Sequence, residues 1–548
     1  MTVWPAPAAA AIVLGLALSP IVSAVPSATA AGQPAPVSVT MIATLTAPAR
    51  TTGFIDPIRL ASYTSEFGLL TRQLNQIINK SVVIGIDPSI LASIRILGTD
   101  APSSATAWLA RLENATNETF PLAWADADLT APLHADSNGL LLPESIDFAI
   151  VPSRFPPAVV TAPSTPTPAP TLDPDASPLP TAASLVAWNY TVDSIAWPTM
   201  NSVTNNDLSI LDRSFDTTIL SSKNIGSETA SSARTTVGPA QVLVSDASLS
   251  ALFSATVASG PLEEWQRSLA SLTAAVGSVT STTEEPASVL IALDRQIATS
   301  DTDLGSTIDA LASSPNVRAV GIAELLQTPL RSTDLIDAPV EDTAIEAVKK
   351  LLVDEAADRE FARIAATPAL ITGQRRLDLL ATLSNSWSAN AIGWETARIA
   401  YETASNALRD RVRIVKSSTI TLWADRASLP VTISNELDQA VTVYVRVRPL
   451  TPLLKVEDSF VPVTVEPGSQ RKASIPVQSL SNGSVELMVT VNVVSGTQIG
   501  PTTFVRTTVQ AGWETPFTIG VGILVVLVFA FGILRTILRR RAARGSEA

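Results

Sequence analysis

The stretch Trp513–Arg544 reads WETPFTIGVGILVVLVFAFGILRTILRRRAAR. Within it, residues 517–538 are apolar apart from Thr518, Arg535 and Thr536. They are long enough to cross a hydrocarbon core of about 30 Å, for which a helix needs about 20 residues. A buried core helix is the alternative, but a core helix of this length usually keeps a polar face. The stretch therefore predicts a single transmembrane helix over 517–538.

Basic residues close this stretch and indicate its orientation. Five arginines occur between Arg535 and Arg544, and basic residues beside a span stay on the cytoplasmic side. We therefore expect a single-pass plasma-membrane protein with its N-terminal ectodomain outside and a short basic tail, 539–548, in the cytoplasm. The helix itself must be the anchor, because a chain without cysteine has no thiol to carry a lipid.

The N-terminus supports the same topology. An apolar run, Ala8–Leu18, is too short to span a bilayer and precedes small-residue sites that end at Ala24 or Ala30, as in a secretory signal peptide. No Lys or Arg precedes the run, which leaves a retained N-terminal anchor as the alternative. We predict a signal peptide over 1–31.

Charge and residue usage exclude several classes of function. The formal net charge is −13, which disfavours binding to nucleic acid or to an anionic lipid surface. The chain has no cysteine and one histidine, His134, so it cannot form disulfides, thiolate sites or multi-histidine metal sites. We expect no metal and no cofactor. His134 is interpreted as a polar residue at a helix end or in a loop, because no G-x-S-x-G elbow supplies a nucleophile for it.

Short β-rich runs alternate with helix-like stretches over 36–335, and several runs are followed at once by an acid. These are VVIGI (82–86) before Asp87, FPLAWA (120–125) before Asp126 and Asp128, QVLVS (241–245) before Asp246, SVLIAL (288–293) before Asp294, and AVGIA (319–323) before Glu324. Strands that alternate with helices favour parallel β/α units. The pattern predicts a β/α barrel-like domain over 36–335.

Residues just beyond the strand ends would line the mouth of such a barrel, where sites form. The candidate catalytic residues are therefore Asp87, Asp126, Asp128, Asp246, Asp294 and Glu324, and the candidate binding residues are Trp124 and Trp197. A pair of carboxyl groups can protonate and attack a glycosidic bond, while an indole face can stack on a sugar ring. The alternative is structural: DPS (87–89), DAD (126–128) and DAS (246–248) resemble helix N-caps, and the tryptophans would then be core residues.

A Pro/Thr/Ala-rich stretch, 155–183, interrupts this alternation. Such a composition cannot pack a core and is typical of an extended segment. It is either a linker between domains or an inserted loop. Because the strand pattern resumes with similar spacing on both sides, we favour an insertion.

The chain changes character twice before the span. A 3.6-residue apolar period predicts two or three helices over 337–415, which would cap the barrel or bridge it to the next domain. From 417 to 511, seven short alternating strands separated by turns match an immunoglobulin-like sandwich of about 100 residues. Its place directly before the span predicts a stalk.

The order of these parts resembles a family of uncharacterised actinobacterial secreted membrane proteins. The segments that carry the resemblance are WLARL (108–112), PLAWADADLTAPLH (121–134), SSTITL (417–422) and LPVTISNEL (429–437), followed by the span and its Arg-rich end. Members are commonly encoded beside the lipid II flippase of peptidoglycan synthesis. The resemblance implies a cell-envelope setting, with the flippase as a possible membrane partner, and carries over no catalytic residue.

Two classes of function remain open at this stage. The first is a non-enzymatic envelope protein whose ectodomain binds a cell-wall glycan or a membrane partner. The second is a metal-independent glycan hydrolase that uses a pair of the acids at the barrel rim. The absence of a recognisable catalytic motif favours the first, and two carboxyl groups about 5–9.5 Å apart across an open cleft would favour the second.

Overall fold

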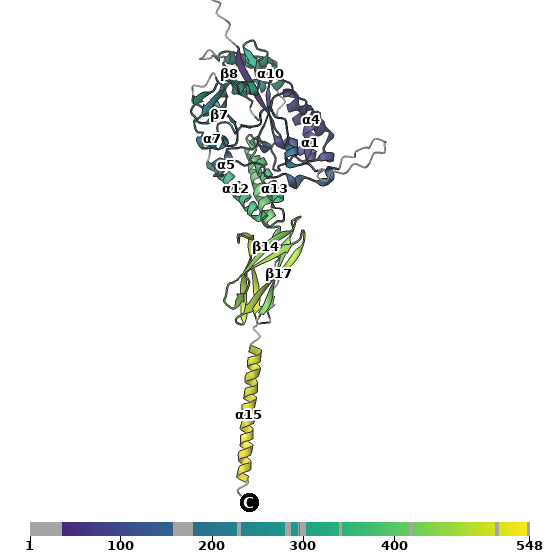
Figure 1. Ribbon diagram of the computed structural model, residues 1–548, viewed down its shortest axis with the longest axis vertical. Helices are drawn as coiled ribbons and strands as arrows, with labels where there is room; N and C mark the ends of the chain where they lie inside the picture. The colour runs from purple at the N-terminus through teal and green to yellow at the C-terminus, as the bar shows by residue number, and fades with distance from the viewer. Residues whose placement is uncertain are drawn as a thin grey trace, which may run out of the picture. The chain divides into compact units, whose positions relative to one another are not determined.

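The computed structural model shows a mixed α/β protein with a long apolar helix at its C-terminal end (Figure 1). The described residues are 36–156, 179–226, 232–279, 287–293, 295, 303–338, 342–415, 420–422, 424, 426–509 and 514–544. The expected signal peptide, most of the Pro/Thr insertion and Asp294 lie outside these ranges.

Seven parallel strands form the centre of the N-terminal α/β region. They are β1 (Val37–Leu45), β2 (Val83–Ile86), β3 (Thr119–Pro121), β4 (Ile195–Ala196), β5 (Thr217–Ser221), β7 (Ala240–Ser245) and β8 (Ser288–Ala292). Their pairing gives the row β4-β5-β7-β8-β1-β2-β3, in which neighbours follow chain order, as in successive β/α units, except where β8 lies beside β1. The two ends of the row are linked by the N–H groups of Thr191 and Val192, which donate to the Thr119 carbonyl.

The strands alternate between two apolar clusters, as the two-residue period of a strand requires. One cluster takes a side chain from every strand of the row, including Ile42, Phe120, Ile219 and Leu290. Neighbouring residues such as Met41 pack instead against the surrounding helices. The seven strands therefore share one apolar cluster on one face of the row.

Helices connect and cover these strands. Those of the α/β region are α1 (Pro57–Thr64), α2 (Leu69–Ile77), α3 (Pro88–Arg95), α4 (Ser103–Glu113), α5 (Ala131–His134), α6 (Ala182–Val186), α7 (Asn205–Leu211), α8 (Ala247–Val257), α9 (Leu262–Gly277), α10 (Leu304–Ala312) and α11 (Ile322–Leu325). Three short strands extend the sheet: β6 (Arg234–Val237) pairs with β7, β10 (Arg331–Thr333) pairs with β6, and β9 (Val317–Ala319), which shares only Ala319 with the predicted run 319–323, pairs with β1. Gly238, with φ of 56°, makes the tight turn between β6 and β7.

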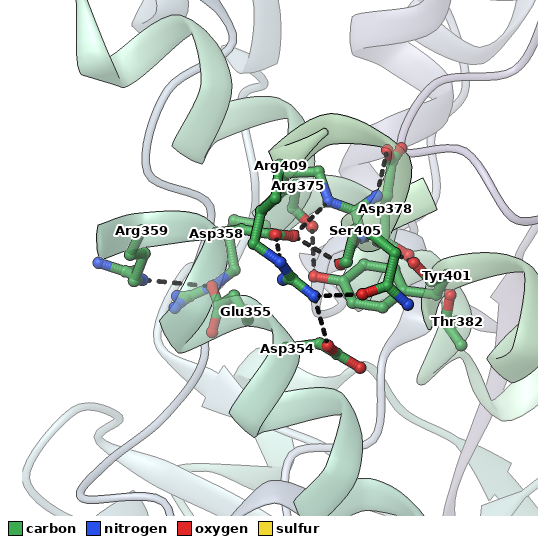
Figure 2. Close-up of polar contacts among 12 residues, drawn as sticks. Asp354, Glu355, Asp358, Arg359, Arg375, Asp378, Thr382, Tyr401, Ser405 and Arg409 are labelled. Carbon is green, nitrogen blue, oxygen red and sulfur yellow. Dashed lines mark hydrogen bonds and ion pairs between the residues drawn. The ribbon is translucent and has the colours of Figure 1, made fainter. Parts of the chain in front are cut away.

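Three longer helices follow, α12 (Asp342–Ala362), α13 (Pro368–Thr382) and α14 (Ala391–Arg409). Helices α12 and α13 lie against the α/β region (Figure 1), and the Asp128 N–H donates to the Leu383 carbonyl. The three helices share a buried ionic cluster around Asp358 (Figure 2). The expected helical segment therefore exists, and it covers part of the α/β region.

The described residues between 412 and 509 form nine strands in two sheets. The four-stranded sheet is β11-β13-β17-β15, from β11 (Val412–Ile414), β13 (Arg426–Asn435), β15 (Leu454–Val456) and β17 (Gln470–Ser479). The five-stranded sheet is β12-β19-β18-β14-β16, from β12 (Ile420–Leu422), β14 (Val441–Pro449), β16 (Phe460–Val465), β18 (Gly483–Asn492) and β19 (Gln498–Val509). Alternate apolar residues of both sheets form one core.

The strand pattern of this region differs from the prediction at two points. Strand β11 falls where a helix was expected, and β15 was not indicated at all. Both have three residues, which is too short for a two-residue period to be recognised. Each is held by pairing with a long neighbour, β13 or β17.

The last element, α15 (Glu514–Arg544), contains the predicted span. Its segment Phe517–Arg540 is long and apolar enough to cross a membrane. No part of that segment is buried against the rest of the described chain. An apolar helix without a protein neighbour is what a membrane anchor requires.

Candidate functional site: a cavity at the strand ends

A cavity of about 470 Å³ opens at the carboxyl ends of β4, β5, β7 and β8. It is lined by Trp197, Thr199, Met200, Asn201, Ser221, Lys223, Ser245, Ala247, Ser250, Ala251, Ser254, Ala292, Leu293, Arg295, Asn385 and Ser388. Its size lies within the range of about 300–1,000 Å³ that is usual for small-molecule sites. Among the described lining residues are two cations and many hydroxyl and amide groups, but no Asp or Glu.

Most of these residues lie at the carboxyl ends of strands or just beyond them. Trp197 follows β4 directly, Ser221 and Ser245 end β5 and β7, and Arg295 comes three residues after β8. The other wall comes from α8, which begins after Asp246, and from the turn between α13 and α14. The helices α12 to α14 therefore cover only part of the strand ends and leave this part open.

Arg295 connects the cavity to the buried interior. Its Nε lies 3.1 Å from Asp126 Oδ1 and 3.0 Å from Oδ2, and its Nη2 donates to the Trp197 carbonyl at 2.6 Å. The guanidinium carbon lies 4.4 Å from the centroid of the Trp197 ring, in a cation–π contact. These contacts hold the arginine flat against the indole at the cavity wall.

Asp126 sits in a strained turn. Both Ala125 and Asp126 have positive φ, 57° and 49°, a conformation that costs a non-glycine residue about 1–2 kcal/mol. The turn is held from two sides: the Ala125 N–H donates to Asp87 Oδ1 at 2.8 Å, and Asn385 Nδ2 donates to the Asp126 carbonyl at 2.9 Å. Backbone strain of this kind persists only where surrounding contacts maintain it, and it clusters at functional sites.

The same surroundings change the acidity of Asp126. Burial raises its pKa to about 6, although Arg295 opposes the rise, and the nearby Asp87 raises it further. Burial likewise raises the pKa of Asp87, against the lowering effect of Arg50 and the Ser89 hydrogen bonds. Two buried carboxyl groups close in space thus disfavour each other's charge.

Two of the predicted acids cap helices. Asp87 accepts from the Ser89 N–H and hydroxyl at the start of α3, and Asp246 accepts from the Ser248 and Leu249 N–H groups at the start of α8. Asp128 accepts from the Thr130 and Ala131 N–H groups in the turn before α5, but the N-cap residue of α5 is Thr130. The capping interpretation is confirmed for Asp87 and Asp246 and is wrong for Asp126, which caps no helix and pairs with Arg295 instead.

Glu324 does not reach this end of the sheet. It lies inside α11, not after a strand, because β9 ends five residues earlier. The neighbouring Ala323 N–H donates to Glu118, which precedes β3, so Glu324 lies near the opposite, amino end of the strands. Its carboxylate pairs with Arg318 on the surface.

The two candidate tryptophans are core residues. Trp124 is 3% exposed, its Nε1 donates to the Gly53 carbonyl, and Phe54 packs against it edge-on. Trp197 is 5% exposed and packs between Arg295 and Phe120. Neither indole offers an open face for sugar stacking, although the edge of Trp197 reaches the cavity.

His134 ends α5, as expected of a helix-end residue. Its Nε2 lies 2.6 Å from Asp207 Oδ2, and this hydrogen bond raises the histidine pKa. Asp207 also closes a capping box with Thr204 at the start of α7. His134 thus joins α5 to α7 at a distance from the cavity lining. Among the described residues, no group of three or more His, Cys, Asp or Glu is placed to hold a metal ion.

The model of the family of unknown function named DUF6049 matches residues 8–545. The chain belongs to this family. A comparison with curated proteins gave no match.

Solved structures resemble parts of this DUF6049 chain. They include the α-amylase AmyC of Thermotoga maritima, with 8% identity over 69% of this chain and 93% of that one (TM-score 0.42). The α-2-macroglobulin of Escherichia coli matches 18% of this chain and 7% of its own length, at 20% identity and a TM-score of 0.16. WR4, an MSP family member of Caenorhabditis elegans, matches 18% of this chain and 98% of its own, at 13% identity and a TM-score of 0.15. Likeness at this level carries no argument about function.

Sequence reasoning missed the polar residues that matter most at the cavity, Arg295, Lys223 and Asn385. Arg295 follows a predicted strand as closely as the acids do, but only carboxylates were sought at the strand ends. Lys223 lies two residues beyond β5 and carries the same signal. Asn385 has no local signal, because its partner Asp126 is 259 residues away.

Proposed function

We propose that this DUF6049 protein is a non-enzymatic, single-pass cell-envelope protein that binds a cell-wall glycan in the cavity at the ends of β4, β5, β7 and β8. The observation that carries the proposal is the lining of that cavity, in which eight of the sixteen described residues carry a hydroxyl or amide group beside apolar side chains. Sugars are recognised by such groups, because each hydroxyl can exchange hydrogen bonds with a side chain that both donates and accepts. A hydrolase is disfavoured because Asp87 and Asp246 are engaged as helix caps, Asp128 is bonded within the turn before α5, and Asp126 is buried beside Arg295.

The remaining parts fit a membrane setting in this proposal. The seven-strand row acts as a barrel-like ectodomain, and residues 417–511 act as an immunoglobulin-like stalk. In this proposal both regions lie outside the cell and the basic tail lies in the cytoplasm, because basic residues follow the span. By the resemblance described above, the protein is actinobacterial and works beside the lipid II flippase in envelope biogenesis. A protease added to intact cells should digest the ectodomain and spare a tag at the C-terminus, and loss of the tag would contradict this topology.

A cavity-filling variant tests the binding proposal. Ala251 lines the cavity from α8, whereas Ala255, one turn later, is exposed and lies outside the lining. Ala251→Trp should abolish binding of the full-length protein, held in phosphatidylcholine nanodiscs, to purified cell-wall glycan, and Ala255→Trp should leave it unchanged. If Ala251→Trp binds as well as wild type while melting at the same temperature, the cavity is not the glycan site.

A further inference from the structure

We propose that the sugar bound in this cavity carries an anionic group, a phosphate or a carboxylate, and that the Lys223 ammonium is its charge partner. This inference rests on the proposed function and names the chemical class of its ligand. It depends on three features of the described lining: a cation on a fixed turn with no ion pair among the described residues, a second cation with its charge already balanced, and hydroxyl groups that can donate to a ligand.

Lys223 is presented on a turn that its neighbours hold in place. The turn, Ser222–Asn224, caps β5, and the Ser222 hydroxyl accepts from the Ala247 N–H at 3.0 Å. Asn224 is buried, and its Nδ2 donates to the carbonyls of Val203 and Ile336. A side chain that leaves such a turn loses less freedom on binding than one from a mobile loop.

Lys223 is exposed and lines the cavity, and no ion pair holds it among the described residues. Of the other described lysines, Lys80, Lys349 and Lys350 pair with carboxylates, whereas Lys455 and Lys472 do not. Lys223 differs from Lys455 and Lys472 because it lines a cavity whose described residues include no Asp or Glu. The alternative is that Lys223 is an ordinary solvated surface lysine. An ordinary surface lysine, however, need not lie in a cavity whose described lining lacks Asp and Glu.

Arg295 does not compete for the ligand's charge. Its guanidinium is paired with Asp126 and bonded to the Trp197 carbonyl, so its positive charge is already balanced. Among the described lining residues, Lys223 therefore supplies the positive charge that no carboxylate balances. Replacing Lys223 should remove the preference for an anion without disturbing the buried Asp126–Arg295 pair.

The hydroxyl groups of the lining suit a ligand rich in acceptors. The Ser221 hydroxyl accepts from the Lys223 N–H at 3.2 Å, and the Ser250 hydroxyl accepts from the Ala292 N–H at 3.1 Å and lies 3.0 Å from Ser245 Oγ. A hydroxyl that accepts from a backbone N–H still carries a proton that it can donate. Phosphate and carboxylate oxygens are strong acceptors, and they would accept from such hydroxyls together with Lys223.

Three probes that share one sugar ring test the inference. They are N-acetylglucosamine, which is uncharged, N-acetylglucosamine 1-phosphate, which carries a phosphate, and N-acetylmuramic acid, which carries a carboxylate. Calorimetric titration of the full-length protein in phosphatidylcholine nanodiscs should show at least one anionic probe binding about tenfold or more tightly than the neutral one. A hydrogen bond between charged groups strengthens binding by about that factor or more. The anionic probe that binds more tightly identifies the source of the charge.

Matched variants locate the effect. Lys223→Met should reduce binding of the anionic probe to the level of the neutral one, Lys223→Arg should restore it, and Lys472→Met, an equal charge change on an exposed strand residue of β17, should have no effect. Equal binding of all three probes to wild type, or an unchanged preference in Lys223→Met, refutes the anionic ligand and leaves glycan binding standing. Failure of all three probes to bind wild-type protein refutes both proposals.

Discussion

Neutralising Asp358 should destabilise the α12–α14 helices far more than neutralising another acid of the same helix. Asp358 is fully buried and accepts hydrogen bonds from Arg375 Nε at 2.8 Å, Ser405 Oγ at 2.6 Å and Arg409 Nη1 at 2.8 Å (Figure 2). Asp358→Asn keeps the shape of the side chain and removes its charge. The Arg375 guanidinium, whose side chain is only 8% exposed, then lacks its main counter-charge.

The expected loss is about 3–5 kcal/mol of unfolding free energy, the usual cost of leaving one member of a buried ion pair uncompensated. Two contacts place the value toward the lower end of that range. Arg375 also lies 3.7 Å from Asp378 Oδ2 and stacks on Tyr401, with its guanidinium carbon 3.8 Å from the ring centroid. Burial raises the pKa of Asp378 to about 6, so above that pH its carboxylate is ionised and partly replaces the lost charge.

The assay is guanidinium denaturation of the full-length protein in detergent micelles at pH 7.5, followed by tryptophan fluorescence and circular dichroism. Trp394 on α14 reports on these helices, because its Nε1 donates to the Thr382 carbonyl of α13. The control is Asp354→Asn, on the same helix. Asp354 pairs with Arg409 at 3.2 Å but is more exposed, so its loss should cost no more than about 1 kcal/mol.

Equal, small losses in Asp358→Asn and Asp354→Asn would refute the reasoning, because they would mean that water or rearranged side chains screen the buried arginine. A double variant separates the charge from the packing. Asp358→Leu combined with Arg375→Met removes both charges and should recover most of the stability lost in Asp358→Asn, since a well-packed apolar pair often replaces a buried ion pair without cost.

Three further predictions concern the cavity region and its supports. Asp126 and Asp378 have pKa values raised to about 6 in the folded protein, whereas an unfolded aspartate has a pKa near 4. Their protonation therefore stabilises the fold fully below the unfolded pKa, and this contribution is lost as the pH rises through about 6. Each residue contributes up to roughly 3 kcal/mol to the unfolding free energy. Asp126→Asn should therefore reduce the fall in melting temperature between pH 4.5 and 7.5. Parallel curves of melting temperature against pH for the variant and the wild type would contradict this prediction. Ala125→Gly should be neutral or stabilising by up to about 1 kcal/mol because it relieves a positive φ, whereas Ala127→Gly, at φ of −64°, should destabilise the protein in the same melting assay. Asp246→Asn should leave stability almost unchanged and Asp246→Ala should cost about 0.5–2 kcal/mol, as a helix cap requires; equal losses in both would mean that its charge matters.

The sequence by itself determined the features that depend on neighbouring residues. The apolar segment 517–538 lies inside the long helix α15, because length and hydropathy suffice to define a span. Strands alternate with helices through the first region because each apolar run is short and bounded by polar residues. Asp87 and Asp246 cap helices because an Asp two residues before a Ser N–H can accept from it without help from any other segment.

Only the tertiary structure decided how the cavity is built. Arg295 meets Asp126 across 169 residues of chain, and Asn385 reaches the same turn from the helices that follow the α/β region. The left-handed conformation of Ala125 and Asp126 has no local cause; it is imposed by partners on other elements. Which side chains converge depends on strand order and helix packing, which are set by the burial of apolar surface over the whole region and not by the residues beside each polar group.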